Sequence, residues 1–338
     1  MDLVKISTNL RPAIELEIQR VINENIPAEF IGTRSILTYH LGWEGEGAGL
    51  EAQGKRIRPL LVLLCAASAC GQWQQALPAA AAVELVHNFS LIHDDIEDRS
   101  VLRRGRSTVW VKWGIPQAIN AGDLMYTLAF TAVLDMSRTV SPAVGLRSAE
   151  VLNKTCIRLT GGQYLDMKYE KQAEVTIDEY WPMIEGKTAS LLECCAVLGG
   201  LAGQVEEAQL NSFLEFGHNL GLAFQILDDW LGIWGDAIQI GKSTESDLVS
   251  GKKTLPVLFG LRQKGQFYRR WIKGNITPDE SHELAIVLRE EGAQQYTQAM
   301  ADQFTQKALD ALSSAAREEN EASASLRQLA LELLSRKQ

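Results

Sequence analysis

Apolar residues recur at helical spacing along nearly the whole chain, and this periodicity limits the possible folds more than any other feature of the sequence. An amphipathic pattern runs from Pro12 to about Asn25, and strongly apolar segments begin at Pro59 and Pro78. Proline is well placed at these starts, because its missing N–H would have no partner in the first turn of a helix. Further helices are predicted over residues 115–135, 143–171, 176–200, 205–232, 255–263, 278–291 and 293–335.

Signals for β-strands are weak by comparison. No run of β-branched residues alternates with polar residues over six positions. The most loop-like stretch is 265–281, which contains Gly265, Gly274 and Pro278. We therefore predict an all-α fold, with a single helical-bundle domain over residues 1–338 and no linker dividing it.

The overall charge narrows the classes of partner. The 338 residues carry a net charge of −9, and 46% of them are hydrophobic, which fits a globular chain with a sizeable core. An acidic chain is poorly suited to nucleic acid, whose phosphates require a basic surface. A small phosphorylated ligand stays compatible with this charge, because carboxylates can hold phosphate through a bridging cation.

The cysteines and the hydropathy pattern indicate a cytoplasmic protein. There are five cysteines, an odd number, and no two of them form a C-x-x-C pair. Reduced thiols are therefore expected, with neither a disulfide framework nor a zinc site. No apolar leader is evident at the N-terminus, and the longest apolar run, near Leu60–Cys70, is too short for a transmembrane segment.

Two aspartate clusters are the strongest candidates for chemistry. Asp94, Asp95 and Asp98 follow the apolar segment that begins at Pro78, and on a helix they share an arc of about 100°. Asp228 and Asp229 follow a similar apolar segment. An acidic cluster is usually a solvated surface, but the buried context and its recurrence favour a cation site. Oxygen-only ligands suit magnesium, so we predict a diphosphate held between the two clusters.

Basic residues bracket these clusters along the chain. Each would by itself be surface charge more often than not, but together they suit contacts to phosphate oxygens. One anionic ligand would then be held through metal and a second by lysine and arginine. The basic residues in question are Lys55, Arg58, Arg103, Arg104, Lys187, Lys242 and Lys252.

In these segments the chain resembles the trans-isoprenyl diphosphate synthases, the polyprenyl synthetase family. A lone D-D-x-x-D is weak evidence, but several motifs in this order and spacing are strong evidence. They run from about Gly54 to Pro256. The matching segments are G-K-R-I-R-P at 54–59, H-N-F-S-L-I-H-D-D-I-E-D at 87–98, L-R-R-G at 102–105, G-G-Q-Y-L-D at 161–166, K-T at 187–188, F-Q-I-L-D-D at 224–229, and G-K with S-D-L-V-S-G-K at 241–252.

The resemblance implies a role for each matching residue. Asp94 and Asp98 would ligate magnesium with support from Asp95, and Asp228, paired with Asp229, would ligate it from the opposite side. The isopentenyl diphosphate would be held by Lys55, Arg58, His87 and Arg104. The allylic diphosphate would be held by Arg103, Lys187, Lys242 and Lys252, with Thr188 and Gln225 lining the reacting centre.

The same resemblance implies the fold and the reaction. The fold would be a helical bundle around a deep central cavity, usually in a homodimer, with about three magnesium ions per active site. Ionisation would leave an allylic cation, isopentenyl diphosphate would attack it, and a proton would then be lost. A site that excludes water would protect the cation.

One residue departs from the family pattern. The second cluster reads Asp228-Asp229-Trp230-Leu231-Gly232, where the family usually has a third aspartate at the last position. Activity is expected to survive, because the resemblance assigns the metal to the first aspartate. Asp236 is a possible partial substitute, and a weakened site in a regulatory subunit is the alternative.

Product length is predicted from residues that precede the first cluster. Phe89 lies five positions before Asp94, and Ser90 lies four positions before it. An aromatic residue followed by a small one, with no insertion inside D-D-x-x-D, resembles one class of C20 synthases. Geranylgeranyl diphosphate is therefore the predicted product, made from dimethylallyl, geranyl or farnesyl diphosphate. A farnesyl or longer product, and Phe89 as an ordinary core aromatic, are the alternatives.

Three other functions share part of this pattern. A class I terpene cyclase uses similar aspartates but needs no second diphosphate, so it leaves the Lys55 and Arg58 turn unexplained. A metal phosphohydrolase, suggested by His87, His93 and Asp94, leaves the Asp228 pair unexplained. A non-catalytic subunit of a heteromeric synthase would give no product by itself.

Overall fold

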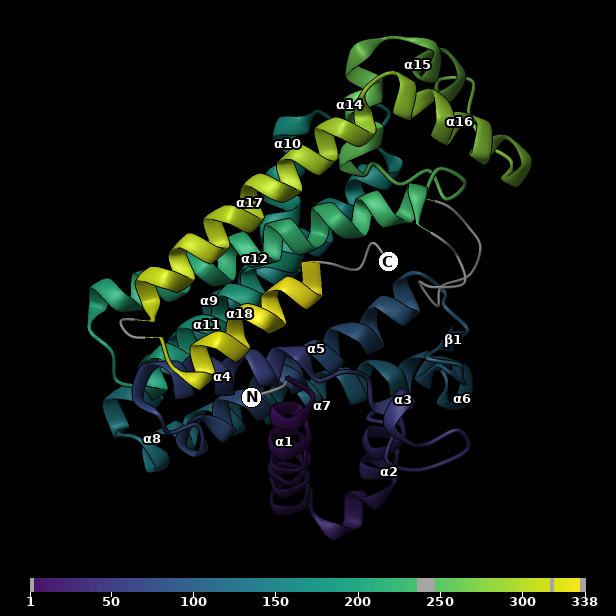
Figure 1. Ribbon diagram of the computed structural model, residues 1–338. Coiled ribbons are helices and arrows are strands. Elements are labelled where there is room, and N and C mark those ends of the chain that lie inside the picture. Colours follow the sequence, from purple (N-terminus) through teal and green to yellow (C-terminus); the bar gives the residue numbers. More distant parts are fainter. Residues whose placement is uncertain (1–2, 236–246, 317–318, 335–338) are drawn as a thin grey trace. The chain divides into compact units, whose positions relative to one another are not determined.

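The computed structural model describes residues 3–235, 247–316 and 319–334, and they form two compact units. The first unit comprises Met1–Lys154, Cys194–Leu210 and Ala316–Leu326, and the second comprises Thr155–Glu193, Asn211–Ala315 and Arg327–Gln338. Both units are built from helices (Figure 1). The all-α prediction is confirmed, while the prediction of a single domain stays a prediction.

The first unit contains most of the N-terminal helices and one minimal hairpin. Its long helices are α1, α4, α5 and α7, and a 3-10 turn precedes α2 and another precedes α5. The elements are α1 (Leu3–Asn25), α2 (Ile31–His40), α3 (Leu50–Gln53), α4 (Ile57–Cys70), α5 (Leu77–Glu97), β1 (Leu102–Arg103), β2 (Arg106–Ser107), α6 (Val109–Trp113), α7 (Ile115–Leu134) and α8 (Met136–Thr139).

The second unit holds the helices near the C-terminus, and four helices contribute residues to both units. The shared helices are α9 (Pro142–Lys171), α11 (Ser190–Ala202), α12 (Glu207–Trp234) and α18 (Glu321–Leu334). The second unit alone contains α10 (Ile177–Ile184), a π-helical segment (Glu185–Ala189), α14 (Leu255–Gln263), α15 (Gln266–Trp271), α16 (Pro278–Glu290) and α17 (Ala293–Ala315).

Helix α5 lies beside α7 in the core of the first unit (Figure 1). Its four alanines from Ala79 to Ala82 are fully buried, and such small side chains let neighbouring helices approach closely. On α7 the matching small residue is Gly122, where an added Cβ would lie 2.2 Å from His93 Nε2. This close pairing holds the C-terminal end of α5, where the first aspartate cluster lies.

Glycines also allow close packing beside the π-helical segment of the second unit. A Cβ on Gly162 of α9 would lie 2.1 Å from the backbone nitrogen of Lys187, and one on Gly221 of α12 would lie 2.4 Å from Ala189 Cα. Both glycines are therefore needed for space. A short π-helical segment inside a helical run is often found at a functional site.

The structure corrects several predicted boundaries. The stretch 265–281 contains helix α15, and the helix predicted over 293–335 is two helices, α17 and α18. The second begins where Asn320 Oδ1 accepts from the backbone N–H of Ser323 (2.9 Å) and Ser323 Oγ accepts from that of Asn320 (2.9 Å), which is an N-terminal cap. Residues 102–107 form a hairpin, because Arg104 and Gly105 adopt left-handed φ angles of 51° and 73°. In the described residues no helix is both long and apolar enough to cross a membrane.

Candidate active site

The first aspartate cluster lies at the end of α5, and its members differ in burial. Asp95 is 1% exposed, Asp94 is half-buried and Asp98, the C-terminal cap of the helix, is exposed. Arg103 Nε donates to both oxygens of Asp95 at 2.9 and 3.0 Å, and its Nη2 lies 2.8 Å from Oδ1. Burial raises the pKa of Asp95, although the Arg103 charge and hydrogen bond oppose this shift. Asp95 thus anchors the β1–β2 hairpin to the helix.

The second cluster, on α12, has the same construction. Asp229 is 4% exposed, whereas Asp228 is half-buried. The Asp229 carboxylate accepts from the Tyr180 hydroxyl (2.7 Å), from Gln225 Nε2 (2.8 Å) and from the Leu255 backbone N–H (3.0 Å). In both pairs, therefore, the second aspartate is committed to the protein interior and the first is the more accessible one.

The helical register explains this difference within each pair. Asp95 continues the buried positions of Leu85, Asn88 and Ile92 at spacings of three and four. Asp229 likewise follows the buried Ile226 by three positions. This periodicity was available in the sequence and is the signal that separates the two aspartates of a pair.

The environment of Asp229 predicts a measurable pH dependence. Burial raises its pKa from 3.8 to about 7, against the three hydrogen bonds that lower it, and the Asp247 charge adds to the rise. A raised folded pKa means that the folded state binds the proton more tightly than the unfolded state does. This contribution to stability is therefore present at low pH and lost as pH rises toward 7. It is of the order of 4 kcal/mol.

Urea unfolding of the wild type and of Asp229→Asn would test this, because asparagine does not titrate. The free energy of unfolding of the wild type, relative to the variant, should fall between about pH 4 and pH 7. Other carboxylates cancel in this difference. A difference that stays constant over this range would contradict the raised pKa.

The hydrogen bonds of Asp229 extend to two other predicted residues. Thr188 Oγ1 donates to Gln225 Oε1 at 2.6 Å, and the other end of the Gln225 amide donates to Asp229. Thr188 lies in the π-helical segment and is 8% exposed. The structure thus brings Thr188, Gln225 and Asp229 together, as a chain of hydrogen bonds starting from the π-helical segment and ending at the second cluster.

Lys187, the neighbour of Thr188, is oriented by an acidic partner on another helix. Its Nζ forms an ion pair with Asp166 Oδ2, and Asp166 lies on α9. Asp166 belongs to the G-G-Q-Y-L-D segment, but the sequence suggested no role for it. Both side chains are about one-third exposed, so this lysine is positioned and still accessible to a ligand.

The residues predicted to hold isopentenyl diphosphate come together in the first unit. Arg58 Nη1 lies 3.4 Å from His87 Nε2, and the Arg104 guanidinium lies so close to Gly54 that a Cβ there would be 2.6 Å from its Cζ. Lys55, the next residue, is exposed. Burial, together with the nearby arginine charges, lowers the pKa of His87 far below its usual range. His87 is therefore neutral and accepts a hydrogen bond from Arg58.

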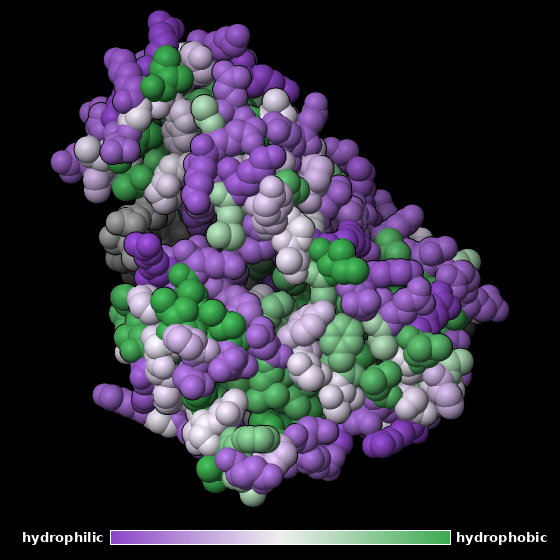
Figure 2. Space-filling view, turned by 180° about the vertical axis from the view of Figure 1, so that it is seen from behind, coloured by the Kyte–Doolittle hydropathy of each residue, from purple (hydrophilic) through white to green (hydrophobic). Residues whose placement is uncertain are grey.

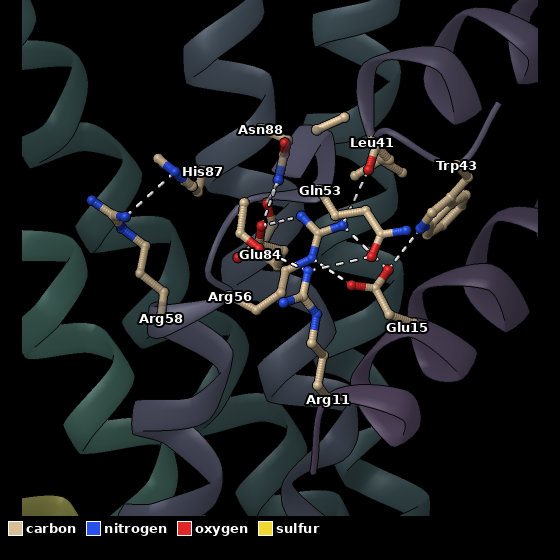
Figure 3. A network of polar contacts seen from close by, with 12 residues as sticks. Arg11, Glu15, Leu41, Trp43, Gln53, Arg56, Arg58, Glu84, His87 and Asn88 are labelled. Carbon is tan, nitrogen blue, oxygen red and sulfur yellow. Dashed lines mark hydrogen bonds and ion pairs between the residues drawn. The ribbon is translucent and has the colours of Figure 1, made fainter. Parts of the chain in front are cut away.

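Arg56 lies between the two predicted phosphate-binding residues of this turn, but it is a buried structural residue (Figure 3). Its Nε donates to Glu15 Oε1 at 2.7 Å, and its Nη1 donates to Glu84 Oε1 at 2.6 Å. Arg56 is the N-cap of α4, and its φ of 52° lies in the left-handed region. Arg56 is therefore buried, whereas Lys55 is exposed and Arg58 is half-buried, although the three residues look similar in the sequence.

The remaining predicted residues are placed as follows. Lys252 is exposed and donates its backbone N–H to Asp247 O at 3.0 Å, while Lys242 and Asp236 lie outside the described residues. Phe89 packs edge-on against Tyr126 of α7, with ring centroids 5.2 Å apart. Ser90 donates its hydroxyl to His87 O at 2.8 Å.

The donors at the aspartate clusters fit magnesium. Asp94 and Asp98 are four residues apart on one helical face and offer only oxygen ligands. In the parts of the chain that the structure describes, no three acidic, histidine or cysteine side chains converge into a cage of their own. Magnesium is typically held by one or two carboxylates, with water and phosphate oxygens completing the octahedron.

Sequence reasoning missed three residues of this region: Arg56, Asp166 and Tyr180. Tyr180 is 1% exposed and bonds Asp229 from a helix that is far away in the sequence. For Tyr180 and Arg56 no local pattern marks the contact. Asp166 lies in the matching segment G-G-Q-Y-L-D, one helical turn after Gly162. Its place in that segment was the signal in the sequence that it could belong to the site.

The comparisons with known proteins agree with this geometry. Residues 48–288 match the family model described as polyprenyl synthetase. The chain is 38% identical over 286 residues to the geranylgeranyl diphosphate synthase of Mycobacterium tuberculosis H37Rv, covering 82% of this chain and 81% of the relative. It is 39% identical over 289 residues to the (2E,6E)-farnesyl diphosphate synthase of the same organism, covering 82% and 79%.

A solved structure is similar over nearly the whole chain. The geranylgeranyl pyrophosphate synthetase from Pyrococcus horikoshii Ot3 matches with a TM-score of 0.87 and 32% identity, covering 98% of each chain. A family model that covers well over half of the residues, together with relatives of this identity and coverage, is sufficient to assign the family. The chain therefore belongs to the polyprenyl synthetase family.

Proposed function

We propose that this protein is a prenyltransferase that condenses isopentenyl diphosphate head-to-tail with an allylic diphosphate. The observation that carries the proposal is the shared construction of the two aspartate pairs. In each, a buried second aspartate fixes the helix end and leaves the first, Asp94 or Asp228, as the accessible carboxylate. The basic turn at Lys55 and Arg58 supplies a separate site for a second anionic substrate.

The side chains of the two clusters and of the π-helical segment have different chemical roles. We assign Asp94, Asp98 and Asp228 to the metal, and Lys187 to the allylic diphosphate. Magnesium, when bound, neutralises the charge that develops on a leaving diphosphate. Asp166 holds Lys187 in place through its ion pair. The hydrogen-bond chain from Thr188 through Gln225 fixes the rotamers beside the second cluster, so that little reorganisation is needed during reaction.

At the site assigned to isopentenyl diphosphate, neutral His87 orients Arg58 toward the diphosphate. A charged histidine would repel the arginines around it, and burial removes that charge. Arg104 is exposed next to Gly54, so both arginines and Lys55 can donate to phosphate oxygens. A terpene cyclase has no second diphosphate to place here, and this cluster therefore favours condensation.

The experiment that tests the function is product analysis with isopentenyl diphosphate and dimethylallyl, geranyl or farnesyl diphosphate in magnesium buffer. Linear prenyl diphosphates and free diphosphate are expected, and activity should vanish with EDTA and return with magnesium. A cyclic hydrocarbon from farnesyl diphosphate alone would indicate a terpene cyclase. No product from any pair of substrates would indicate a non-catalytic subunit.

We propose geranylgeranyl diphosphate as the product. Sequence identity does not separate the two product classes, because the C20 and C15 relatives are equally similar to this chain. The support comes from Phe89, which lies on α5 before the aspartates and packs against Tyr126, and from Ser90, the small residue that follows it.

Phe89→Ala should lengthen the product beyond C20, because removing the ring opens space along α5 for further isoprene units. Chromatography of the dephosphorylated products would measure this. Tyr268→Ala, a substitution of another partly exposed aromatic in a different unit, is the control and should leave the length unchanged. A Phe89→Ala enzyme that still stops at the wild-type length would remove Phe89 as the limit.

We also propose a homodimer. On α7, Ile115, Ile119 and Leu134 are 47%, 43% and 48% exposed, and the side chain of Asp123, in the same arc, is 68% exposed. Apolar side chains are gathered on the surface shown in Figure 2. Exposed apolar faces of this kind are typical of subunit interfaces. Sedimentation equilibrium should give the mass of two copies.

A further inference from the structure

Helix α1 lies outside the segments that resemble the family, yet its side chains contact the turn that carries Lys55. The helix ends at Asn25, and the family model matches only from residue 48 onward. The matching motifs therefore assign no role to α1. In Figure 3, however, Arg11 and Glu15 point from this helix toward the residues on either side of Lys55.

The Arg11 guanidinium holds the end of the short helix α3. Its Nη2 donates to Gly54 O at 2.9 Å and lies 3.3 Å from both Leu50 O and Gln53 Oε1. Carbonyl oxygens at a helix C-terminus have no partner within the helix, so an outside donor satisfies them. Gly54 O belongs to the peptide group that joins Gly54 to Lys55. Arg11 therefore fixes the plane of this peptide group, and with it the direction in which Lys55 leaves the turn.

Glu15, one helical turn after Arg11, holds the other side of Lys55. Its carboxylate accepts from Arg56 Nε at 2.7 Å and from Trp43 Nε1 at 2.7 Å. Residues four positions apart lie on the same face of a helix. Both chain neighbours of Lys55 are thus held by side chains from one face of α1, while Lys55 itself is exposed.

The backbone conformation of this turn depends on such contacts. Gly54 and Arg56 have φ angles of 75° and 52°, both in the left-handed region. Glycine adopts this region freely, but a residue with a side chain stays there only where surrounding contacts maintain it. Arg104 adds a contact from the β1–β2 hairpin, because its Nη1 donates to Ala52 O at 2.9 Å. The turn is therefore held by α1 and by an arginine that is itself assigned to isopentenyl diphosphate.

We propose that Arg11 is a positioning residue for the isopentenyl diphosphate site. It acts through the turn at Leu50–Gly54, whose shape sets how Lys55 and Arg104 are placed relative to each other. The inference rests on the proposed function, since that function assigns these two residues to the substrate. Isopentenyl diphosphate keeps its own diphosphate during the condensation, so its binding contacts are similar in the ground state and the transition state. Loss of Arg11 should therefore raise KM for this substrate and leave kcat nearly unchanged.

Two variants of Arg11 and a matched control test this role. Arg11→Met removes the charge and the donors, and Arg11→Lys keeps the charge without the planar fork. Arg20→Met is the control, because Arg20 lies on the same helix, is 34% exposed and pairs with Asp135, which is not part of the turn. Steady-state rates would give kcat and the KM values for isopentenyl and farnesyl diphosphate. Calorimetry in EDTA would give the affinity for isopentenyl diphosphate alone, and thermal melting would establish that each variant is folded.

Arg11→Met should raise the KM for isopentenyl diphosphate, and weaken its binding in calorimetry, by about tenfold, the size of one lost hydrogen bond to a charged group. Its kcat and its KM for farnesyl diphosphate should stay within about twofold of wild type. Arg11→Lys should show an intermediate rise of about threefold, because one ammonium replaces only part of the fork. Arg20→Met should match wild type in both KM values, whatever it loses in melting temperature.

The outcomes separate this inference from the function on which it rests. A wild-type enzyme that makes prenyl product, with an Arg11→Met variant of unchanged KM for isopentenyl diphosphate, would overturn the inference alone. Equal rises in both KM values, or the same rise in Arg20→Met, would also overturn it, because the effect would then be a general loosening of the fold. If Arg11→Met does not fold, Arg11→Lys decides by the same comparison. A wild-type protein without condensation activity would overturn the proposed function, and the inference with it.

Discussion

Replacing Asp94 by asparagine is expected to lower kcat by about two to three powers of ten, because the variant loses a charged oxygen ligand where charge develops in the transition state. Asparagine has nearly the same shape, and the Asp94 side chain is half-buried at a helix end, so the fold should persist. Steady-state rates at saturating substrate and several magnesium concentrations would measure the effect.

Two controls make this prediction specific. Asp310→Asn removes a carboxylate from an exposed helix and should leave kcat unchanged. Asp95→Asn should act differently from Asp94→Asn, because Asp95 pairs with Arg103. It should lower thermal stability as well as rate. If Asp94→Asn retained wild-type kcat at all magnesium concentrations, Asp94 would not be a metal ligand.

Replacing Arg56 by methionine should lower the free energy of unfolding by about 3–5 kcal/mol, the usual effect of removing one partner from a buried ion pair. The Arg56 side chain is fully buried and that of Glu84 is 3% exposed, so the variant leaves the Glu84 carboxylate without its cation (Figure 3). Asn88 Nδ2 still donates to Glu84 at 2.9 Å, but a neutral amide does not compensate the charge. Urea unfolding would measure the loss.

A double variant distinguishes lost charge pairing from lost packing. Arg56→Met/Glu84→Gln removes the arginine and the more deeply buried of its two carboxylate partners. It should recover part of the stability, while Glu15 still lacks its cation. Arg58→Met, two residues along the same turn, should weaken isopentenyl diphosphate binding with little effect on unfolding, since Arg58 is not part of the buried pair. Equal losses of stability in Arg56→Met and the double variant would contradict the ion-pair explanation.

The aspartate pairs show how far sequence reasoning reached. The motifs located both clusters, and helical spacing contained the signal that Asp95 and Asp229 are buried. The partners of these residues were not predictable from that signal. Tyr180 and Leu255 approach Asp229 from helices 49 and 26 residues away in the sequence, and no local pattern encodes such contacts.

The basic residues show the limit more clearly. Lys55, Arg56 and Arg58 look alike in the sequence, yet one is exposed, one is fully buried and one is half-buried. Their difference depends on Glu15 and Glu84, which belong to two other helices. Charge by itself therefore predicts that a phosphate site is nearby but does not identify which side chains reach the phosphate.

The sequence by itself determined the helical class, the order of the motifs and the positions of the two clusters, because helix periodicity and motif spacing are properties of neighbouring residues. Only the tertiary structure decided which side chains hold Asp95 and Asp229 in place and that Arg56 is structural. The physical reason is the same in each case. Burial and electrostatic partners are set by contacts between segments that are distant in the chain, and such contacts form only when the helices pack.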